Sequence, residues 1–406
     1  MKGANNTRFY NRRTFIRHSA LFGTVGLLTP GLLASACGNK TGRDMDQSYK
    51  EGKKLGIALV GLGRYSSGQL APALQETQYC YLSGIVTGSP EKEPKWMKKY
   101  NIPKKNVYNY DNFDSIAENP DIDIIYIVLP NGMHAEYTIR AAKAGKHVIC
   151  EKPMATSVAD AEAMIRACAE NNVMLSLGYR LHFEPHHLRV MQLGQKKVFG
   201  PVESIKGIDN MVINNWEWRL DKELAGGGPL MDLGIYTIQG ACYTMGEWPV
   251  EVVEANYGKV TKPELFKEVE QSITFTLKFP NGTQSTHTTS YADQGNLLEA
   301  SARDGWWKLS PAYSYSGING ETSEGPMDIQ NVNQQARQMD YFAQCVMDNK
   351  PILVPGDMGL RDVKIMMAVY EAADSGKSVK LDLSGLDIPK YDIHARHNEA
   401  LETSMK

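Results

Sequence analysis

Residues 55–66 read LGIALVGLGRYS, and this stretch decides the fold of the chain. Its first six residues form an apolar run that predicts a short buried strand. Gly61 and Gly63 follow this strand directly, and Ser66 stands where the usual pattern has a third glycine. Gly61 permits a tight turn, Gly63 lets the backbone approach a pyrophosphate, and the helix that opens here supplies amide donors. Placed directly after the first strand of a strand–helix unit, this motif predicts a dinucleotide-binding site.

The end of the second predicted strand, residues 81–86, bears on the choice of dinucleotide. An acid at this position would bind the ribose 2′-hydroxyl of NAD. The chain continues instead through Thr87, Ser89 and Lys92. Hydroxyls and an ammonium suit a 2′-phosphate, which a carboxylate would repel, so the sequence favours NADP over NAD. The alternative is a solvated turn in which Glu91 is the acid that binds NAD.

The strand–helix alternation leads to a lysine at a strand end. Further strands are predicted at residues 122–129, 147–150 and 173–177, with helices near 91–100 and 134–144 and another that begins near Ser157. The strands are mostly apolar, as parallel strands buried on both faces are. After the strand at 147–150, Pro153 removes a backbone donor and keeps Lys152 extended. Ligands bind at this edge of open α/β sheets, so we expect Lys152 to meet a substrate oxygen, the alternative being a surface lysine in a loop.

From residue 178 the pattern changes to that of an antiparallel sheet. Apolar and polar residues alternate over 269–279, which predicts a strand with one buried and one exposed face. Asn281-Gly282 then predicts a hairpin turn into a second strand at 283–291. Helices are expected near residues 332–347 and 358–374.

The first 37 residues are expected to be an export signal. They contain Lys2 and four arginines but no acid, and residues 11–17, NRRTFIR, match the twin-arginine pattern. Residues 33–38, LASACG, resemble a lipoprotein cleavage box with Cys37 as the lipidated residue. Cleavage by an ordinary signal peptidase after Ala36 is the alternative. The prediction is therefore export to the periplasm, free or as a lipid-anchored protein, with no transmembrane span in the mature chain.

Composition excludes several other classes of protein. With 42% hydrophobic and 22% charged residues, the 406-residue chain is typical of globular proteins of two or three domains. Its formal net charge is −2, and without the signal 39 basic and 46 acidic residues remain, which gives −7. A mildly acidic body without basic clusters argues against nucleic acid as a partner. The five cysteines after Cys37 are odd in number and irregularly spaced, so they predict buried thiols rather than disulfides.

Several motifs, in the same order, resemble the glucose-fructose oxidoreductase family of the Gfo/Idh/MocA superfamily. The motifs are GLGRYS at 61–66, LPN at 129–131, CEKPMATSVAD at 150–160, GYR at 178–180, WRL at 218–220, ELAGGG at 223–228, MDLGIY at 231–236 and YEAA at 370–373. The resemblance implies an N-terminal Rossmann domain followed by a C-terminal α/β domain with a large, mostly antiparallel open sheet. The expected parts are a signal at 1–37, a polar arm at 38–53, the Rossmann domain at 54–177, a substrate and oligomerisation domain at 178–385 and a tail at 386–406.

The resemblance also assigns the site. It makes Lys152 catalytic and places Asp232 and Tyr236 in an Asp-x-x-x-Tyr motif, where most of the superfamily has His instead of Tyr. Residues four apart on a helix share a face, so Asp232 can orient what Tyr236 touches. The Lys152 ammonium favours proton loss from the phenol, which can then act as general base on a sugar hydroxyl. Expected substrate contacts are Arg180, Arg219 and Tyr315. Expected cofactor contacts are Gly61, Gly63, Arg64, Tyr65, Thr87, Ser89, Lys92, Pro130, Asn131, His134, Glu151 and Lys152.

The implied activity is hydride transfer between a sugar carbon and tightly bound NADP, with a second sugar as acceptor, in a homo-oligomer of two or four chains. A glycoside 3-dehydrogenase is one alternative. Another is an NAD-dependent glycosidase of the superfamily that acts by oxidation and elimination, but such enzymes commonly have His where Tyr236 stands. A third, an inactive sugar-binding protein, would be expected to have lost Lys152 or the glycines. No metal is expected: His182, His186 and His187 resemble a ligand cluster, but Pro185 breaks the helical spacing.

Overall fold

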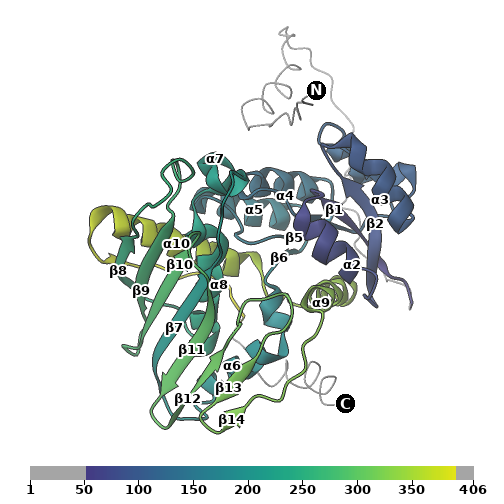
Figure 1. The fold of residues 1–406 in the computed structure, drawn as a ribbon. Coiled ribbons are helices and arrows are strands. Elements are labelled where there is room, and N and C mark those ends of the chain that lie inside the picture. Colours follow the sequence, from purple (N-terminus) through teal and green to yellow (C-terminus); the bar gives the residue numbers. More distant parts are fainter. Residues whose placement is uncertain (1–51, 390–406) are drawn as a thin grey trace, which may run out of the picture. The chain divides into compact units, whose positions relative to one another are not determined.

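A parallel sheet is built from the first six strands of residues 52–389, the part of the chain that the computed structural model describes. These strands are β1 (Leu55–Val60), β2 (Cys80–Val86), β3 (Val107–Tyr108), β4 (Ile124–Ile127), β5 (His147–Cys150) and β6 (Leu175–Leu177). They pair in the order β3-β2-β1-β4-β5-β6 (Figure 1). The order reverses between β1 and β4, so the loops after these two strands meet where such sheets bind dinucleotides.

Helices follow these strands as the sequence predicts. The longer ones are α3 (Glu93–Tyr100), α4 (His134–Lys143) and α5 (Val158–Glu170). Ser157 caps α5, because its hydroxyl accepts a hydrogen bond from the backbone N–H of Asp160 at 3.1 Å. The glycine-rich loop leads into a π-helical turn, η1 (Ser66–Leu70), and a short helix, α2 (Ala71–Ala73).

A second sheet, of nine strands within residues 52–389, lies entirely after residue 178. Its strands are β7 (Val202–Asn210), β8 (Glu251–Tyr257), β9 (Ser272–Lys278), β10 (Gln284–Ser290), β11 (Gly295–Ala302), β12 (Gly305–Leu309), β13 (Gly320–Thr322), β14 (Gly325–Pro326) and β15 (Val379–Lys380). All neighbours are antiparallel except β7 and β10, which are parallel. The predicted fold class is therefore confirmed. The predicted hairpin is confirmed too, since β9 and β10 are joined through Gly282, which has a φ of +91°.

Strand boundaries differ from the sequence prediction at several places, since β4 and β6 are shorter than the predicted 122–129 and 173–177, and β9 differs most clearly. Val269 was expected in the strand that became β9, but β9 begins at Ser272. Val269 lies instead in the preceding loop and is buried in a small apolar cluster with Phe266 and Tyr291. The alternating pattern extends into this loop because a buried loop residue and a buried strand residue look the same in sequence.

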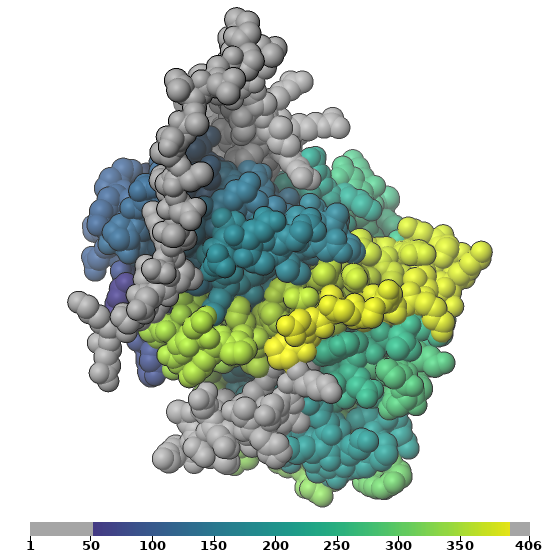
Figure 2. All heavy atoms as spheres, turned by 180° about the vertical axis from the view of Figure 1, so that it is seen from behind, coloured from purple at the N-terminus to yellow at the C-terminus, as the bar shows by residue number. Residues whose placement is uncertain are grey.

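Helices α6 (Pro185–Gln195) and α8 (Ile235–Met245) pack against each other, and α8 packs on β7. Helix α9 (Gln334–Asp348) touches β2 and η1. Helix α10 (Gly356–Ser375) packs on α5, β6 and β8, so it connects the two sheets. In the view from behind, the yellow residues of α10 run between the blue first half and the green second half (Figure 2). The first sheet is therefore tied to the second through α10.

The export signal, Cys37, most of the polar arm and most of the predicted tail lie outside the described residues. Between residues 52 and 389, none of the helices combines the length and apolar character needed to cross a bilayer. The described cysteines are free and buried, as predicted; they are Cys80, Cys150, Cys168, Cys242 and Cys345.

Candidate active site

The glycine-rich loop is shaped to accept a phosphate group. Gly61 has a φ of +93°, and a Cβ there would lie 2.6 Å from the carbonyl oxygen of Val128, so only glycine fits. At Gly63 a Cβ would meet nothing within 4 Å, which leaves the backbone open to a ligand. Ser66 stands in place of the third glycine. Its hydroxyl donates a hydrogen bond to the carbonyl of Gly61 at 2.6 Å and so stabilises the turn. These features fit the pyrophosphate of a dinucleotide.

The predicted 2′-phosphate residues lie beside this loop. Lys92 Nζ donates to the carbonyl of Leu62 at 3.0 Å, which brings its ammonium to the glycine-rich loop. Thr87 is buried, and its hydroxyl accepts from the backbone N–H of Ser89 at 3.1 Å. The structure thus brings Thr87, Ser89 and Lys92 to the end of β2, while Glu91 is exposed.

Lys152 is held by contacts from both halves of the molecule. It follows β5, and its peptide bond to Pro153 is cis. Beneath it, the buried Glu151 carboxylate accepts the Tyr126 hydroxyl at 2.7 Å and the Lys152 backbone N–H at 3.2 Å. Burial raises the pKa of Glu151. Because its oxygens are occupied by these contacts, Glu151 positions Lys152.

The Lys152 ammonium is tied to Asp232, which lies in a π-helical turn, η8 (Leu230–Gly234), before α8. Lys152 Nζ donates to the Asp232 carbonyl at 2.6 Å and to its carboxylate at 3.2 Å. The prediction of one regular helix from Asp232 to Tyr236 was wrong in this respect. A π-helical turn holds one extra residue, an arrangement frequent at functional sites, and here its carbonyl accepts the lysine.

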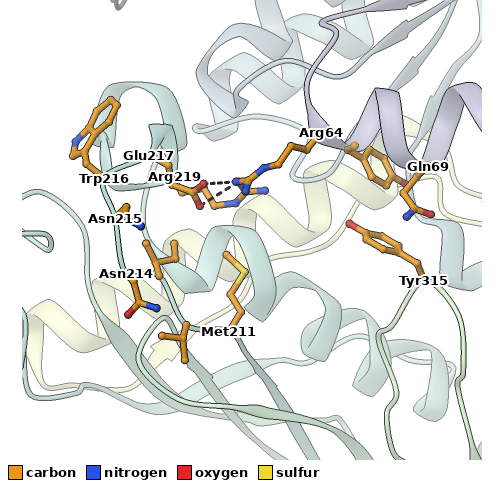
Figure 3. Close-up of a pocket in the computed structure, with 12 residues that line it drawn as sticks. Arg64, Gln69, Met211, Asn214, Asn215, Trp216, Glu217, Arg219 and Tyr315 are labelled. Carbon is orange, nitrogen blue, oxygen red and sulfur yellow. Dashed lines mark hydrogen bonds and ion pairs between the residues drawn. The ribbon is translucent and has the colours of Figure 1, made fainter. Parts of the chain in front are cut away.

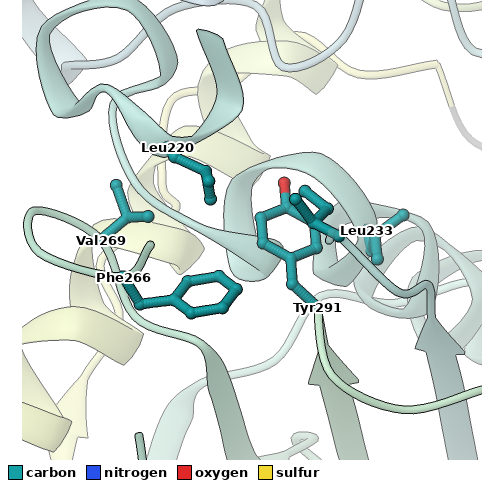
Figure 4. Packing of buried hydrophobic residues seen from close by; sticks show 6 residues of the cluster. Leu220, Leu233, Phe266, Val269 and Tyr291 are labelled. Atoms are coloured by element: carbon teal, nitrogen blue, oxygen red, sulfur yellow. The ribbon is translucent and has the colours of Figure 1, made fainter. Parts of the chain in front are cut away.

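Asp232 also binds Arg219 and Tyr291. Its Oδ2 accepts from Arg219 Nε at 2.7 Å and from the Tyr291 hydroxyl at 3.2 Å. Burial disfavours the carboxylate, but Arg219 and Lys152 outweigh burial and hold the pKa of Asp232 below its usual range. The Tyr291 ring, whose hydroxyl contacts Asp232, belongs to a cluster of buried apolar side chains (Figure 4). The members of that cluster are Ile213, Leu220, Leu233, Phe266, Val269 and Tyr291.

Tyr236 lies against two cations and a second tyrosine. Lys152 Nζ is 4.5 Å and the Arg180 guanidinium 5.0 Å from the centre of its ring. The Tyr313 ring stacks on it at 6.0 Å. Burial would lower the pKa of Lys152, but Tyr236 and Asp232 outweigh burial and raise it above its ordinary value. Lys152 is therefore a cation at neutral pH and can donate hydrogen bonds.

Of the predicted substrate contacts, Arg180 is buried and Tyr315 is exposed. Arg180 donates to the carbonyls of Ser314 and Tyr313 at 3.1 and 2.6 Å and to the Gln334 side chain. Its guanidinium lies 4.6 Å from the centre of the Tyr315 ring. Tyr315 in turn packs on Tyr65 of the glycine-rich loop at 5.5 Å. Arg180 therefore orders the segment that carries both tyrosines, Tyr313 and Tyr315.

A cavity of about 830 Å³ lies beside Tyr65, Tyr315 and Arg219 (Figure 3). It is lined by Arg64, Tyr65 and Gln69 from the first sheet's side, and by the segment after β7, Arg219 and Tyr315 from the other. Arg64 reaches across to Glu217 at 2.5 Å, and Glu217 also pairs with Arg219 at 3.4 Å. An alternating series of charges thus runs from the glycine-rich loop to Lys152. We call this set of residues the charge series. Its members are Arg64, Glu217, Arg219, Asp232 and Lys152.

His134 and Asn131, both predicted as cofactor contacts, hold protein segments together, and the cofactor contact of Asn131 stays a prediction. His134 is fully buried, and its two ring nitrogens lie 2.8 Å from the carbonyls of Leu129 and Pro153. Burial lowers its pKa. Asn131, which follows Pro130, donates to the carbonyl of Ala225 at 2.8 Å. The prediction of a direct His134 contact is corrected, because its ring has no exposed surface.

The three histidines that resemble a ligand cluster also form hydrogen bonds with protein groups. His182 binds Gln239, His186 binds Glu184 at 2.7 Å, and His187 lies 2.7 Å from the carbonyl of Ala312. In the described part of the chain, no group of three or more His, Cys, Asp or Glu side chains could hold a metal ion.

Sequence reasoning missed Asp209, Glu217 and Tyr291. Glu217 stands directly before the WRL motif at 218–220, but its partner Arg64 is 153 positions away. Asp209 lies at an inward position of β7, after Ile205 and Gly207, and only the pairing of the strands shows that this charged residue is on a buried face. Tyr291 ends the second hairpin strand and offered no such signal.

Known proteins resemble the chain over most of its length. Residues 55–179 match a family described as oxidoreductases with an NAD-binding Rossmann fold, and residues 187–306 match the GFO/IDH/MocA C-terminal domain. A crystal structure of aldose-aldose oxidoreductase from Caulobacter crescentus, complexed with glycerol, is 39% identical, covers 81% of this chain and 100% of that one, and has a TM-score of 0.79. D-xylose 1-dehydrogenase [NADP(+)] from Haloarcula marismortui is 28% identical over 84% of this chain and 97% of its own. D-glucoside 3-dehydrogenase from Escherichia coli is 27% identical over 80% and 97%. This chain belongs to the Gfo/Idh/MocA oxidoreductase family, and it is an NAD(P)-dependent oxidoreductase.

Proposed function

We propose that the chain is an NADP-dependent sugar oxidoreductase of the glucose-fructose oxidoreductase type, in which a second sugar accepts the hydride that the first has given up. The observation that carries this proposal is the meeting of Lys152, Asp232 and Tyr236 at the carboxyl edge of the first sheet. The names of the relatives support it, because they describe enzymes that act on aldoses and glycosides.

When bound, the nicotinamide would accept a hydride from the carbon of the substrate alcohol and return it to the acceptor. The protein's own groups handle the proton. Lys152, held as a cation by Tyr236 and Asp232, donates a hydrogen bond to the substrate oxygen and stabilises its negative charge. Tyr236, with two cations against its ring, is placed to take the hydroxyl proton as general base. Asp232 keeps Lys152 in position and is itself oriented by Arg219.

The residues around the site suit a neutral ligand with many hydroxyl groups. Arg180, Arg219 and Tyr315 offer hydrogen-bond donors, and the pairing of Arg219 with Asp232 keeps the site from being a cluster of one sign. We place the oxidation at C1 of an aldose, which gives a lactone. Oxidation at C3 of a glycoside is the second candidate, favoured by the resemblance to D-glucoside 3-dehydrogenase.

A sugar panel tests this proposal. The purified protein, loaded with NADP, is mixed with single aldoses and glycosides, and the reduced-nicotinamide absorbance and the products are recorded. We expect an aldose to reduce the nucleotide and to yield a lactone, and a second sugar then to reoxidise it. Formation of a 3-keto glycoside would instead support the second candidate. If no sugar of the panel reduces the nucleotide, the proposed function is wrong.

The predicted export signal adds a requirement, although it lies outside the described residues. A protein exported in the folded state enters a compartment without an NADP pool, so we propose that the nucleotide is loaded before export and stays bound. Retention requires reoxidation in place, and two sugars that react in turn would give ping-pong kinetics. Protein purified from the periplasm should therefore contain an equimolar amount of nucleotide. If the purified protein contains no nucleotide and turns over only with added NADP, nucleotide retention is refuted and the protein is an ordinary dehydrogenase.

A further inference from the structure

Asp209 is a buried acid beside the proposed catalytic residues. It lies in β7 and is 5% exposed. In the sheet it pairs with Thr289, whose hydroxyl donates to the carbonyl of Pro229 at 3.0 Å, immediately before η8. Two residues back on the same face of β7, a Cβ at Gly207 would lie 2.7 Å from Thr237 of α8. Asp209 therefore lies where η8 passes into α8, next to Asp232.

Within residues 52–389, the Asp209 carboxyl has charged neighbours but no hydrogen-bond partner. Lys152 and Arg180 attract it, Asp232 repels it, and Tyr313 faces it from the segment after β12. Among residues 52–389, no donor forms a hydrogen bond with its side chain. Buried polar groups in folded proteins are nearly always hydrogen-bonded, so an unpaired carboxyl calls for a partner from outside the chain.

Space for that partner lies close by. Met211 follows Asp209 by two residues along the extended backbone, is held by a bond from its N–H to the Ser290 carbonyl, and lines the cavity. Burial, followed by repulsion from Asp232, raises the pKa of Asp209 to about 8 even though Lys152 and Arg180 oppose this. At neutral pH most of the carboxyl is then protonated, and a neutral acid can both donate and accept hydrogen bonds, as a sugar hydroxyl can.

We propose that Asp209, as a neutral acid, binds a hydroxyl group of the polyhydroxylated substrate beside the position that reacts. This inference rests on the proposed function, since it requires a sugar in the site. It adds a substrate-binding residue from β7 to those on the loops, and it predicts that ionisation of one carboxyl weakens sugar binding.

The pH range of the effect follows from the neighbours. Four groups face Asp209. Lys152 and Arg180 have raised pKa values and stay positively charged, and Asp232 has a lowered pKa and stays negatively charged. Tyr313 has a raised pKa and stays neutral. Among these five groups, Asp209 alone changes charge between pH 7 and pH 9. The neutral form is present below its pKa, so sugar affinity should fall as the pH rises through about 8.

The test compares the wild type with Asp209→Asn and Asp209→Ala. Asparagine can donate and accept but cannot ionise, whereas alanine can do neither. Sugar KM and kcat are measured from about pH 7 to pH 9, and sugar binding is followed separately by tryptophan fluorescence. We expect alanine to raise KM by roughly two- to tenfold, the value of one neutral hydrogen bond, and to change kcat less. Wild-type KM should rise as the pH passes through about 8. The asparagine variant should lose less sugar affinity than the alanine variant, and its KM should not change between about pH 7 and pH 9.

A matched control is Asp304→Asn, which removes an exposed carboxylate of a surface ion pair and should leave the pH profile as in the wild type. An unchanged KM in Asp209→Ala, or a wild-type pH profile in Asp209→Asn, would overturn the proposal while leaving the proposed function standing. Failure of every sugar to bind to the wild-type protein would overturn both. Thermal melting and nucleotide content of each variant verify that the fold is retained.

Discussion

Substitution of Asp232 by asparagine tests the centre of the proposed mechanism. The carboxylate of Asp232 contacts Lys152 at 3.2 Å, Arg219 at 2.7 Å and the Tyr291 hydroxyl at 3.2 Å. Asparagine has nearly the same size and keeps the backbone carbonyl that accepts Lys152 Nζ at 2.6 Å. The change therefore removes one negative charge between two cations and leaves the lysine attached at one point.

The expected loss follows from these contacts. Hydrogen bonds to charged groups contribute about 1.5–3 kcal/mol, and one neutral acceptor remains in the asparagine side chain. Loss of about one such bond corresponds to roughly a ten- to hundredfold decrease in the rate of nucleotide reduction. Because Asp232 helps to raise the pKa of Lys152, this pKa should also fall in the variant. The decrease should be smaller than for removal of the lysine itself.

The assay is single-turnover reduction of enzyme-bound nucleotide by sugar, followed by absorbance. Single-turnover conditions separate the chemical step from product release. Nucleotide content and melting temperature show whether Asp232→Asn is folded and loaded. Glu321→Gln, which neutralises a carboxylate paired with Lys308 on β12, is the matched control and should react like the wild type. A rate for Asp232→Asn within twofold of the wild type would refute the argument that this carboxylate positions the lysine.

Four further substitutions test neighbouring parts of the site. Lys152→Ala and Tyr236→Phe should each lower turnover by roughly a hundred- to ten-thousandfold with the fold intact, and a near wild-type rate for both would contradict their assignment. Lys92→Ala should weaken NADP binding by roughly ten- to a hundredfold in direct titration and change NAD binding little. If the wild-type protein binds NAD more tightly than NADP, the assignment of Thr87, Ser89 and Lys92 to a 2′-phosphate is wrong. Glu217→Gln should speed nucleotide release by up to about fivefold, as expected for loss of an exposed pair with Arg64, and slower release would contradict this.

The sequence predicted those parts of the site that depend on short-range patterns. The turn at Gly61 follows from a local motif, and the position of Lys152 follows from a strand followed by proline. The π-helical turn at Asp232 was missed because one extra residue in a helical turn leaves the apolar pattern almost unchanged. The pair between Arg64 and Glu217 was missed because side-chain pairing across 153 positions depends on how the two sheets pack.

The inward position of Asp209 could not be predicted from the sequence for a different reason. An acid in a strand is normally read as part of the exposed face, and β7 has both exposed and buried positions. Whether position 209 faces inward depends on the register of β7 against β10 and on the close approach of α8 at Gly207. Neither is encoded within the strand itself. The sequence of a single strand therefore could not reveal that its acid lies beside Lys152, which follows a strand of the other sheet.

The charge series explains why the site needs both halves of the chain. It begins at Arg64 and ends at Lys152, both on the first sheet's side, but each connecting residue comes from the second half. Without Asp232, Lys152 would lose a partner that raises its pKa, while burial would continue to lower it. The nucleotide loop and the lysine are each predictable from the first half. The charge state on which the lysine's proposed role depends arises only when the second half packs against it.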